Sequence, residues 1–184
     1  MVDGKIALIT GAGQGIGRAI AVEMAHQGAA AVAVVDRSAQ TAAQTAHLVR
    51  DAGTEVEAIV CDLRDRDQIE AMVAGTVARF GGLDVLINNA GIIETSLTDQ
   101  CAVDTLPEEV WDAVYEVNLR AVWLATKFAA PHLRRSKRGP NIVNAASVSG
   151  LTGFPLGPIY CTSKGGVVQL TKVTAVDLAP TVRC

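Results

Sequence analysis

Residues 5–17 read Lys-Ile-Ala-Leu-Ile-Thr-Gly-Ala-Gly-Gln-Gly-Ile-Gly. The first part, Lys5 to Thr10, is a short apolar run that predicts a buried strand, and four glycines follow it at alternate positions. Glycines after a strand allow a tight turn and a close approach of the backbone to a ligand. The helix that we expect from Gly15 offers unpaired N–H groups and a positive dipole end to a pyrophosphate. This stretch therefore predicts a dinucleotide site.

The same alternation of short apolar runs and longer helical stretches continues along the chain. We expect strands at residues 5–10, 31–35, 56–61, 85–88 and 141–146, and helices at 15–27, 39–52, 66–80, 107–134 and 158–179. Strands rich in Val, Ile and Ala that alternate with helices predict an α/β fold, a doubly wound parallel sheet of the Rossmann type with helices on both faces. Ligands are then expected beyond the carboxyl ends of the strands.

Length, composition and charge exclude several classes of function. The chain has 184 residues, 49% of them hydrophobic, which predicts a single domain over residues 1–184. A net charge of −3 gives no basic surface for nucleic acid or an anionic membrane, and we interpret the one basic run, residues 134–138, as a solvated helix end. Because Asp3-Gly4-Lys5 directly precedes the first strand, we expect no signal peptide or anchor, and a cytoplasmic protein.

The cysteines are widely spaced and form no Cys-x-x-Cys pair; they are Cys61, Cys101, Cys161 and Cys184. Since the chain has only three histidines, we expect free thiols and no metal site. We interpret Cys161 as a small helix residue, with a reactive thiol as the alternative.

Several polar residues and one glycine fall at or just after the ends of the expected strands: Gly11, Asp36, Asp62, Asn89 and Ser147. Asp36 follows the glycine turn by roughly 20 residues, where an acidic side chain accepts hydrogen bonds from the adenosine ribose and repels a 2′-phosphate. This favours NAD. Arg37 leaves NADP as the alternative, because a guanidinium beside the ribose attracts that phosphate.

Tyr160 and Lys164 stand four residues apart, so on a helix they share one face. A nearby ammonium lowers the pKa of a phenol and lets it exchange protons near neutral pH. Taken alone, the pair is equally typical of an exposed helix surface.

The motifs Thr10-Gly-x-x-x-Gly-x-Gly17, Asn88-Asn89-Ala90-Gly91, Ser147 and Tyr160-x-x-x-Lys164 occur in this order. Together they resemble the short-chain dehydrogenase/reductase family in its common form, and the resemblance covers the whole chain. It implies a catalytic tetrad of Asn118, Ser147, Tyr160 and Lys164. It also implies cofactor contacts from Gly11, Gln14, Gly15, Ile16, Gly17, Asp36, Arg37, Asp62, Leu63, Asn89, Ala90, Gly91, Tyr160 and Lys164.

The resemblance implies reversible hydride transfer between a nicotinamide and an alcohol or ketone, with Tyr160 exchanging the hydroxyl proton. Lys164 would hold the nicotinamide ribose, Ser147 the substrate oxygen, and Asn118 a water in a proton relay. Without the resemblance, Asn118 reads as a core amide, Asp62 as a helix N-cap and Asn89 as a turn residue.

The expected helix at 107–134 is apolar on more than one side, so a single sheet cannot bury it. We expect its second face, with the helix at 158–179, to form a homodimer or homotetramer.

Members of the family continue beyond the equivalent of Pro180 with further strands, a Pro-Gly turn and a substrate lid, none of which precedes Cys184. We therefore expect an unpaired apolar edge on the strand at 141–146 and a substrate pocket open to water. Two alternatives to an enzyme follow: a shortened dinucleotide-binding protein without catalysis, and a subunit-interaction module.

Overall fold

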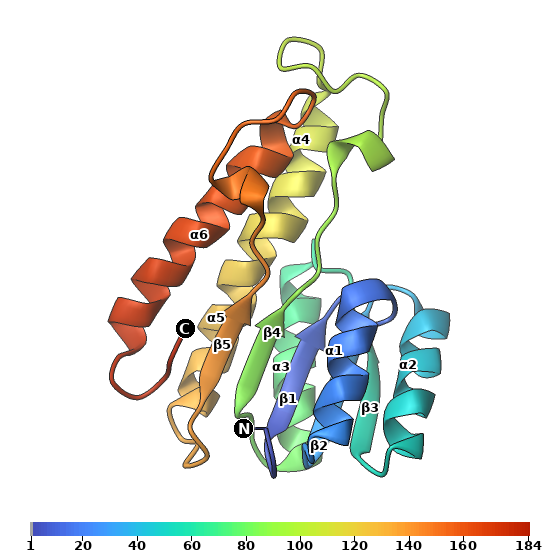
Figure 1. Cartoon of the computed structure of the whole chain (residues 1–184), viewed down its shortest axis with the longest axis vertical. Helices are drawn as coiled ribbons and strands as arrows, with labels where there is room; N and C mark the ends of the chain where they lie inside the picture. Colours follow the sequence, from blue (N-terminus) through green and yellow to red (C-terminus); the bar gives the residue numbers. More distant parts are fainter. Residues whose placement is uncertain (1) are drawn as a thin grey trace.

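The computed structural model describes residues 2–184, and its centre is β1 (Ile6–Thr10), whose five residues are all buried. β1 pairs on one side with β2 (Ala31–Asp36), which pairs with β3 (Glu55–Val60), and on the other with β4 (Val85–Asn88), which pairs with β5 (Asn141–Asn144). All these pairings are parallel, in the order β3-β2-β1-β4-β5 (Figure 1). The α/β fold expected from the alternating pattern is confirmed.

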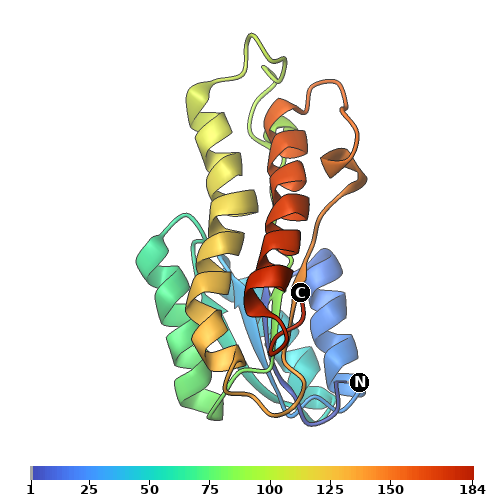
Figure 2. The same ribbon diagram turned by 90° about the vertical axis from the view of Figure 1, so that its left-hand side faces the viewer.

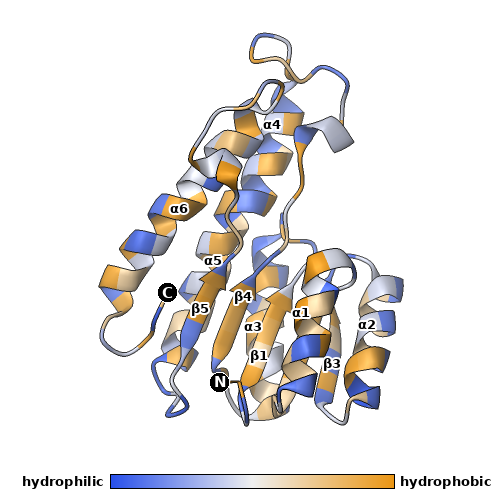
Figure 3. Ribbon diagram, viewed as in Figure 1, coloured by the Kyte–Doolittle hydropathy of each residue, from blue (hydrophilic) through white to orange (hydrophobic). Residues whose placement is uncertain are grey.

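Helices cover both faces of the sheet (Figures 1 and 2). They are α1 (Gly15–His26), α2 (Ala39–Asp51), α3 (Arg66–Phe80), α4 (Glu108–Tyr115), α5 (Ala121–Leu133) and α6 (Pro158–Leu178). Because side chains of a strand alternate between faces, Ala7 and Ile9 enter the core with α1 and α2, whereas Leu8 enters the core with α3 and α5. Burial on both faces explains why the three inner strands β1, β2 and β4 are almost entirely hydrophobic, whereas the edge strand β3 alternates with glutamates (Figure 3).

The long helix expected at 107–134 is present and runs without a break through α4 and α5. One turn between them, η2 (Glu116–Arg120), is π-helix, which the sequence did not predict. Asn118 lies in this turn and binds the backbone of Ile92 with both ends of its amide. Irregular turns of this kind occur frequently at functional sites.

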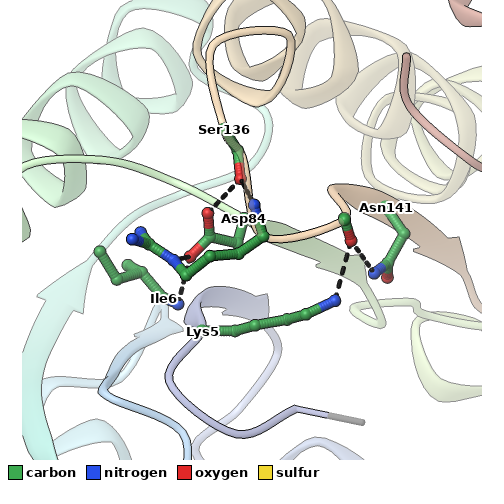
Figure 4. A network of polar contacts seen from close by, with 7 residues as sticks. Lys5, Ile6, Asp84, Ser136 and Asn141 are labelled. Atoms are coloured by element: carbon green, nitrogen blue, oxygen red, sulfur yellow. Dashed lines mark hydrogen bonds and ion pairs between the residues drawn. The ribbon is translucent and has the colours of Figure 1, made fainter.

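A polar network fastens the amino ends of the central strands (Figure 4). Asp84 is fully buried, and its carboxylate accepts hydrogen bonds from the Ile6 N–H at 2.8 Å, from Arg138 Nε at 2.8 Å and from the Ser136 hydroxyl. Lys5 donates to the Gly139 carbonyl at 2.8 Å. The basic run at 134–138 is therefore not only a solvated helix end, because Arg138 pairs with a buried carboxylate.

The edge of β5 is paired at its beginning, which corrects the expectation of an unpaired edge. The Ile142 N–H donates to the Arg183 carbonyl at 2.8 Å, and the Arg183 N–H donates to the Pro140 carbonyl at 3.2 Å. Val182 is buried in the core with α5. Farther along the strand, the side chain of Val143 is half exposed.

None of the helices between residues 2 and 184 is long and apolar enough to span a bilayer.

Candidate functional site

A cleft of about 610 Å³ opens at the carboxyl ends of the strands, beside β1 and β4. The strand order reverses between these two strands, since β2 and β3 lie on one side of β1 and β4 and β5 on the other. Ligands of open α/β sheets bind at such a point. The lining includes twelve residues that the sequence singled out: Gly11, Gln14, Gly15, Ile16, Gly17, Asp36, Arg37, Asp62, Leu63, Asn89, Ala90 and Gly91.

The glycine turn after β1 is shaped by close contacts that leave no room for a side chain. Gly11 has a φ of +63°, and a Cβ there would lie 2.8 Å from the Ala90 Cα. A Cβ on Gly17 would collide with the Gly11 carbonyl oxygen. The residue before α1, Gln14, makes no side-chain cap hydrogen bond, so its side chain does not occupy this helix N-terminus. The turn can therefore present backbone N–H groups to a phosphate.

Asp36 ends β2 and holds the glycine turn in place. One carboxylate oxygen accepts from the Gly13 N–H at 2.9 Å. The other accepts from the Ser38 N–H at 3.0 Å and from the Thr41 hydroxyl at 3.3 Å. The carboxylate is thus fixed at the rim of the cleft, next to the exposed Arg37.

Asp62 follows β3, the strand that pairs with β2, and also lines the cleft. Its carboxylate accepts from the Arg64 N–H at 2.9 Å. The alternative role of Asp62 as the N-cap of the next helix is wrong, because Asp65 caps α3 through the N–H groups of Asp67 and Gln68. Arg64 also lines the cleft, although no motif pointed to it, and its guanidinium pairs with Glu116 at 2.8 Å.

Asn89 joins the ends of β1 and β4. Its amide donates to the Thr10 carbonyl at 3.1 Å and to the Gly11 carbonyl at 3.3 Å. The Thr10 hydroxyl accepts in turn from the N–H groups of Asn89 and Ala90. Asn89 is therefore more than a turn residue, because it fixes the glycine turn against the β4 end. Thr10, a polar residue at the end of an apolar strand, is a further signal in the sequence for a contact between these two strand ends.

Asn118 is fully buried, and its amide is satisfied by protein atoms. It exchanges two hydrogen bonds of 2.8 Å with the Ile92 backbone and donates to the Ser163 hydroxyl at 3.2 Å. Ser163 itself donates to the Tyr160 carbonyl at 2.8 Å. Ser163 was missed by the sequence reasoning, although it lies within the Tyr160 to Lys164 motif.

Lys164 and Tyr160 lie on one side of α6, as expected. The Lys164 ammonium is buried, donates to the Ala145 carbonyl at 2.6 Å, and lies 5.8 Å from the centre of the Tyr160 ring. Burial lowers the pKa of Lys164 from its usual value. A Cβ on Gly91 would lie 3.4 Å from both the Lys164 Nζ and the Asn118 Oδ1, so these two groups converge on Gly91.

Ser147 lies apart from this group of contacts. It precedes the short 3-10 turn η3 (Val148–Gly150), and its hydroxyl accepts from the Ser149 N–H and donates to the Ser149 hydroxyl, both at 3.2 Å. The structure therefore links Asn118, Tyr160 and Lys164 through Gly91 and Ser163, whereas Ser147 is held locally.

The cysteines and the possible metal ligands of the described residues form neither a disulfide nor a metal-binding group. The four cysteines are free thiols. Within residues 2–184, no group of three or more His, Cys, Asp or Glu side chains is placed to hold a metal.

Comparison with known proteins gives consistent matches. A family model described as short chain dehydrogenase matches residues 5–184. The 3-oxoacyl-[acyl-carrier-protein] reductase FabG of Thermotoga maritima is 38% identical over 97% of this chain and 70% of that protein. The 2-(R)-hydroxypropyl-CoM dehydrogenase of Xanthobacter autotrophicus is 40% identical over 98% of this chain and 71% of that protein.

Solved structures give the same result. Carveol dehydrogenase from Mycobacterium avium in complex with NAD superposes with a TM-score of 0.92 at 32% identity, covering 99% of this chain and 69% of that one. The chain thus spans about 70% of the length of the relatives it matches.

Proposed function

Since the chain belongs to the short-chain dehydrogenase family, we propose that it is an NAD(H)-dependent enzyme that interconverts an alcohol and a ketone. The observation that carries this proposal is that the Lys164 Nζ and the Asn118 amide both lie next to Gly91. Gly91 lines the cleft, and so does the N-terminus of α1, which has no side-chain cap.

The cleft fits a nicotinamide dinucleotide. The close packing of Gly11 and Gly17 brings backbone to the surface of the turn, and the uncapped N-terminus of α1 suits a pyrophosphate. When bound, the nicotinamide ring supplies the hydride acceptor or donor. Ile16, of which 74% is exposed, stands at the open side of this turn, where it would cover the phosphates.

Asp36 supports NAD over NADP. Its carboxylate is held by two backbone N–H groups and a hydroxyl, so it cannot turn away from an incoming 2′-phosphate without breaking those bonds. Arg37 is exposed beside it and is the group that would offset this repulsion.

Tyr160 is proposed to carry the proton. Its phenol would accept the proton that the substrate hydroxyl loses during oxidation and return it during reduction. The Lys164 ammonium lies 5.8 Å from the centre of the ring and is kept in place by the Ala145 carbonyl, so it would attract the negative charge that develops on the phenol oxygen during proton transfer. Burial of Lys164 opposes its charge, so the Ala145 bond also helps to retain the ammonium.

Ser147 and Asn118 would have supporting roles. The Ser147 hydroxyl is bonded only to Ser149 among the described residues, so it can turn to a substrate oxygen at small cost. Asn118 holds the Ile92 backbone and Ser163, and through them the two segments that meet at Gly91. Its contribution is to orient these segments and the water of the proposed relay.

Assembly into a homodimer or homotetramer is part of the proposal. Four exposed apolar side chains lie on the helices that the sequence assigned to subunit contacts: Trp111, Trp123, Val173 and Val176. A subunit interface would bury them.

The test combines binding and turnover. Titration with NADH, followed by fluorescence, should show saturable binding, and a panel of secondary alcohols and ketones should reveal NAD(H)-linked turnover. Lys164→Ala should weaken both, whereas Lys172→Ala, which removes an exposed ammonium from the same helix, should change neither. Binding without turnover would favour the non-catalytic dinucleotide-binding alternative, and absence of both would favour the subunit-interaction module.

A further inference from the structure

Glu94 is a buried carboxylate that binds the start of α6 from a distant part of the chain. It begins the short 3-10 turn η1 (Glu94–Ser96), which follows β4, and none of its surface is exposed. Its Oε1 atom accepts hydrogen bonds from the N–H groups of Ile159 and Tyr160, both at 3.2 Å. Figure 1 shows that the segment after β4 rises to the end of the molecule where α6 begins.

This contact replaces a cap that α6 lacks. The residue before the helix is Gly157, which has no side chain, and Pro158 at the first position has no N–H to satisfy. The next two N–H groups belong to Ile159 and Tyr160, and Glu94 binds both. Its negative charge also faces the positive end of the helix dipole.

The second carboxylate oxygen of Glu94 does not serve helix stability. Among the described residues, Oε2 has no hydrogen-bond partner and is shielded from solvent. Burying a charged group with an unpaired oxygen costs free energy, and a neutral side chain would accept the same two N–H bonds at a lower cost. Groups of this kind call for a functional explanation.

The segment around Glu94 connects α6 to the cofactor cleft. The Glu94 carbonyl accepts from the N–H groups of Leu97 and Thr98 at 2.8 and 3.0 Å. Leu97 lines the cleft. Glu94 therefore binds both the backbone of a cleft-lining residue, through its carbonyl, and the backbone of Tyr160, through its carboxylate.

From these contacts we propose that Glu94 is a positioning residue, which fixes the Tyr160 phenol relative to the cofactor cleft. The inference rests on the proposed function for the role of Tyr160, but the contact itself is independent of it. Catalytic groups must be held to within about 0.5 Å, and a shift of about 1 Å can cost about a hundredfold in rate. A bond to the N–H of Tyr160 itself controls where this side chain leaves the helix.

Two substitutions separate positioning from mere folding. Glu94→Met keeps most of the volume and removes the acceptor, so kcat should fall by at least about tenfold while the dissociation constant for NADH stays within about twofold. Glu94→Gln keeps an acceptor oxygen, so it should retain kcat within about threefold. Glu109→Gln makes the same chemical change at an exposed glutamate of α4 and should leave kcat unchanged.

A second readout needs no turnover. In amide hydrogen-exchange experiments, the Ile159 and Tyr160 N–H groups should be protected in the unmutated chain and in Glu109→Gln, and should exchange at least about tenfold faster in Glu94→Met. If the unmutated chain binds NADH but turns over no substrate, the proposed function fails, while the exchange rates still test whether Glu94 binds these two N–H groups. The proposal is overturned if the two N–H groups exchange equally fast in the unmutated chain and in Glu94→Met, if folded Glu94→Met keeps its kcat, or if Glu94→Gln loses as much kcat as Glu94→Met. If Glu94→Met does not fold, Glu94→Gln decides: it should keep the protection of both N–H groups and its kcat within about threefold, and a larger loss of kcat overturns the proposal.

Discussion

The carboxylate of Asp36 accepts a hydrogen bond from the Gly13 N–H at 2.9 Å, which joins the end of β2 to the glycine turn after β1. One residue thereby shapes the turn that would receive the pyrophosphate and places a negative charge at the rim where the adenosine ribose would bind. The two effects can be separated, because asparagine keeps an acceptor oxygen and removes the charge.

The unmutated chain should bind NADH more tightly than NADPH. Asp36→Asn should reduce the ratio of the two dissociation constants by about tenfold, or about 1.4 kcal/mol. The gain should come mainly from tighter NADPH binding, because repulsion of the 2′-phosphate is removed. Fluorescence titration of both cofactors measures it. Arg37→Ala serves as the control variant. If the unmutated chain bound NADPH more tightly than NADH, Arg37 and not Asp36 would determine the cofactor preference.

Asp84→Ala should lower the free energy of unfolding by about 2 to 3 kcal/mol, because the Ile6 N–H and the Ser136 hydroxyl lose a buried acceptor. Chemical denaturation measures it. Asp67→Ala, which removes an exposed carboxylate paired with Arg66, should change stability by less than about 0.5 kcal/mol.

The contribution of Asp84 should also depend on pH. Burial opposes its charge, but the bonds from Ser136, Ile6 and Arg138 outweigh it and hold the pKa of Asp84 below its usual value. The carboxylate therefore stabilises the fold above the unfolded-state pKa of about 3.9, and this stability is lost as pH falls through the lower folded-state pKa. The stability gap between the unmutated chain and Asp84→Ala should shrink below about pH 4. A gap that stays constant down to pH 2 would contradict it.

Cys61 should resist alkylation even though it lines the cleft. Burial, followed by the charges of Asp62 and Asp65, raises its pKa to about 12, and only the thiolate reacts readily. Cys161 is partly exposed and should react first with iodoacetamide at pH 8. Peptide mass mapping over time measures the order, and denaturant should remove the difference. Equal rates at Cys61 and Cys161 in the folded chain would be inconsistent with this burial.

The positions of strands and helices could be predicted because hydrophobic periodicity is local. The cleft lining could be predicted because the carboxyl ends of parallel strands meet at one edge of the sheet, and because the family resemblance names the residues there. By contrast, Glu94 lies 65 residues before Ile159, and the bond between them depends on how two loops return to the same end of the sheet.

The same limit applies to the buried polar groups. The partners of Asp84 come from β1 and from the loop before β5, and no local pattern joins them. The π-helical turn at Asn118 and the pairing of Arg183 with β5 also depend on contacts between distant segments. These features follow from tertiary packing, whereas the motif residues are recognisable from their neighbours in sequence.

The most direct test of the account is Tyr160→Phe, compared with Tyr115→Phe. These are the two tyrosines of the chain, and Tyr115 is partly exposed on α4. With any alcohol that the unmutated chain oxidises, Tyr160→Phe should lower kcat by at least about a hundredfold, because it removes the group that exchanges the proton. The dissociation constant for NADH should stay within a few fold, and Tyr115→Phe should retain its activity. Substantial turnover by Tyr160→Phe would contradict the proposed proton transfer.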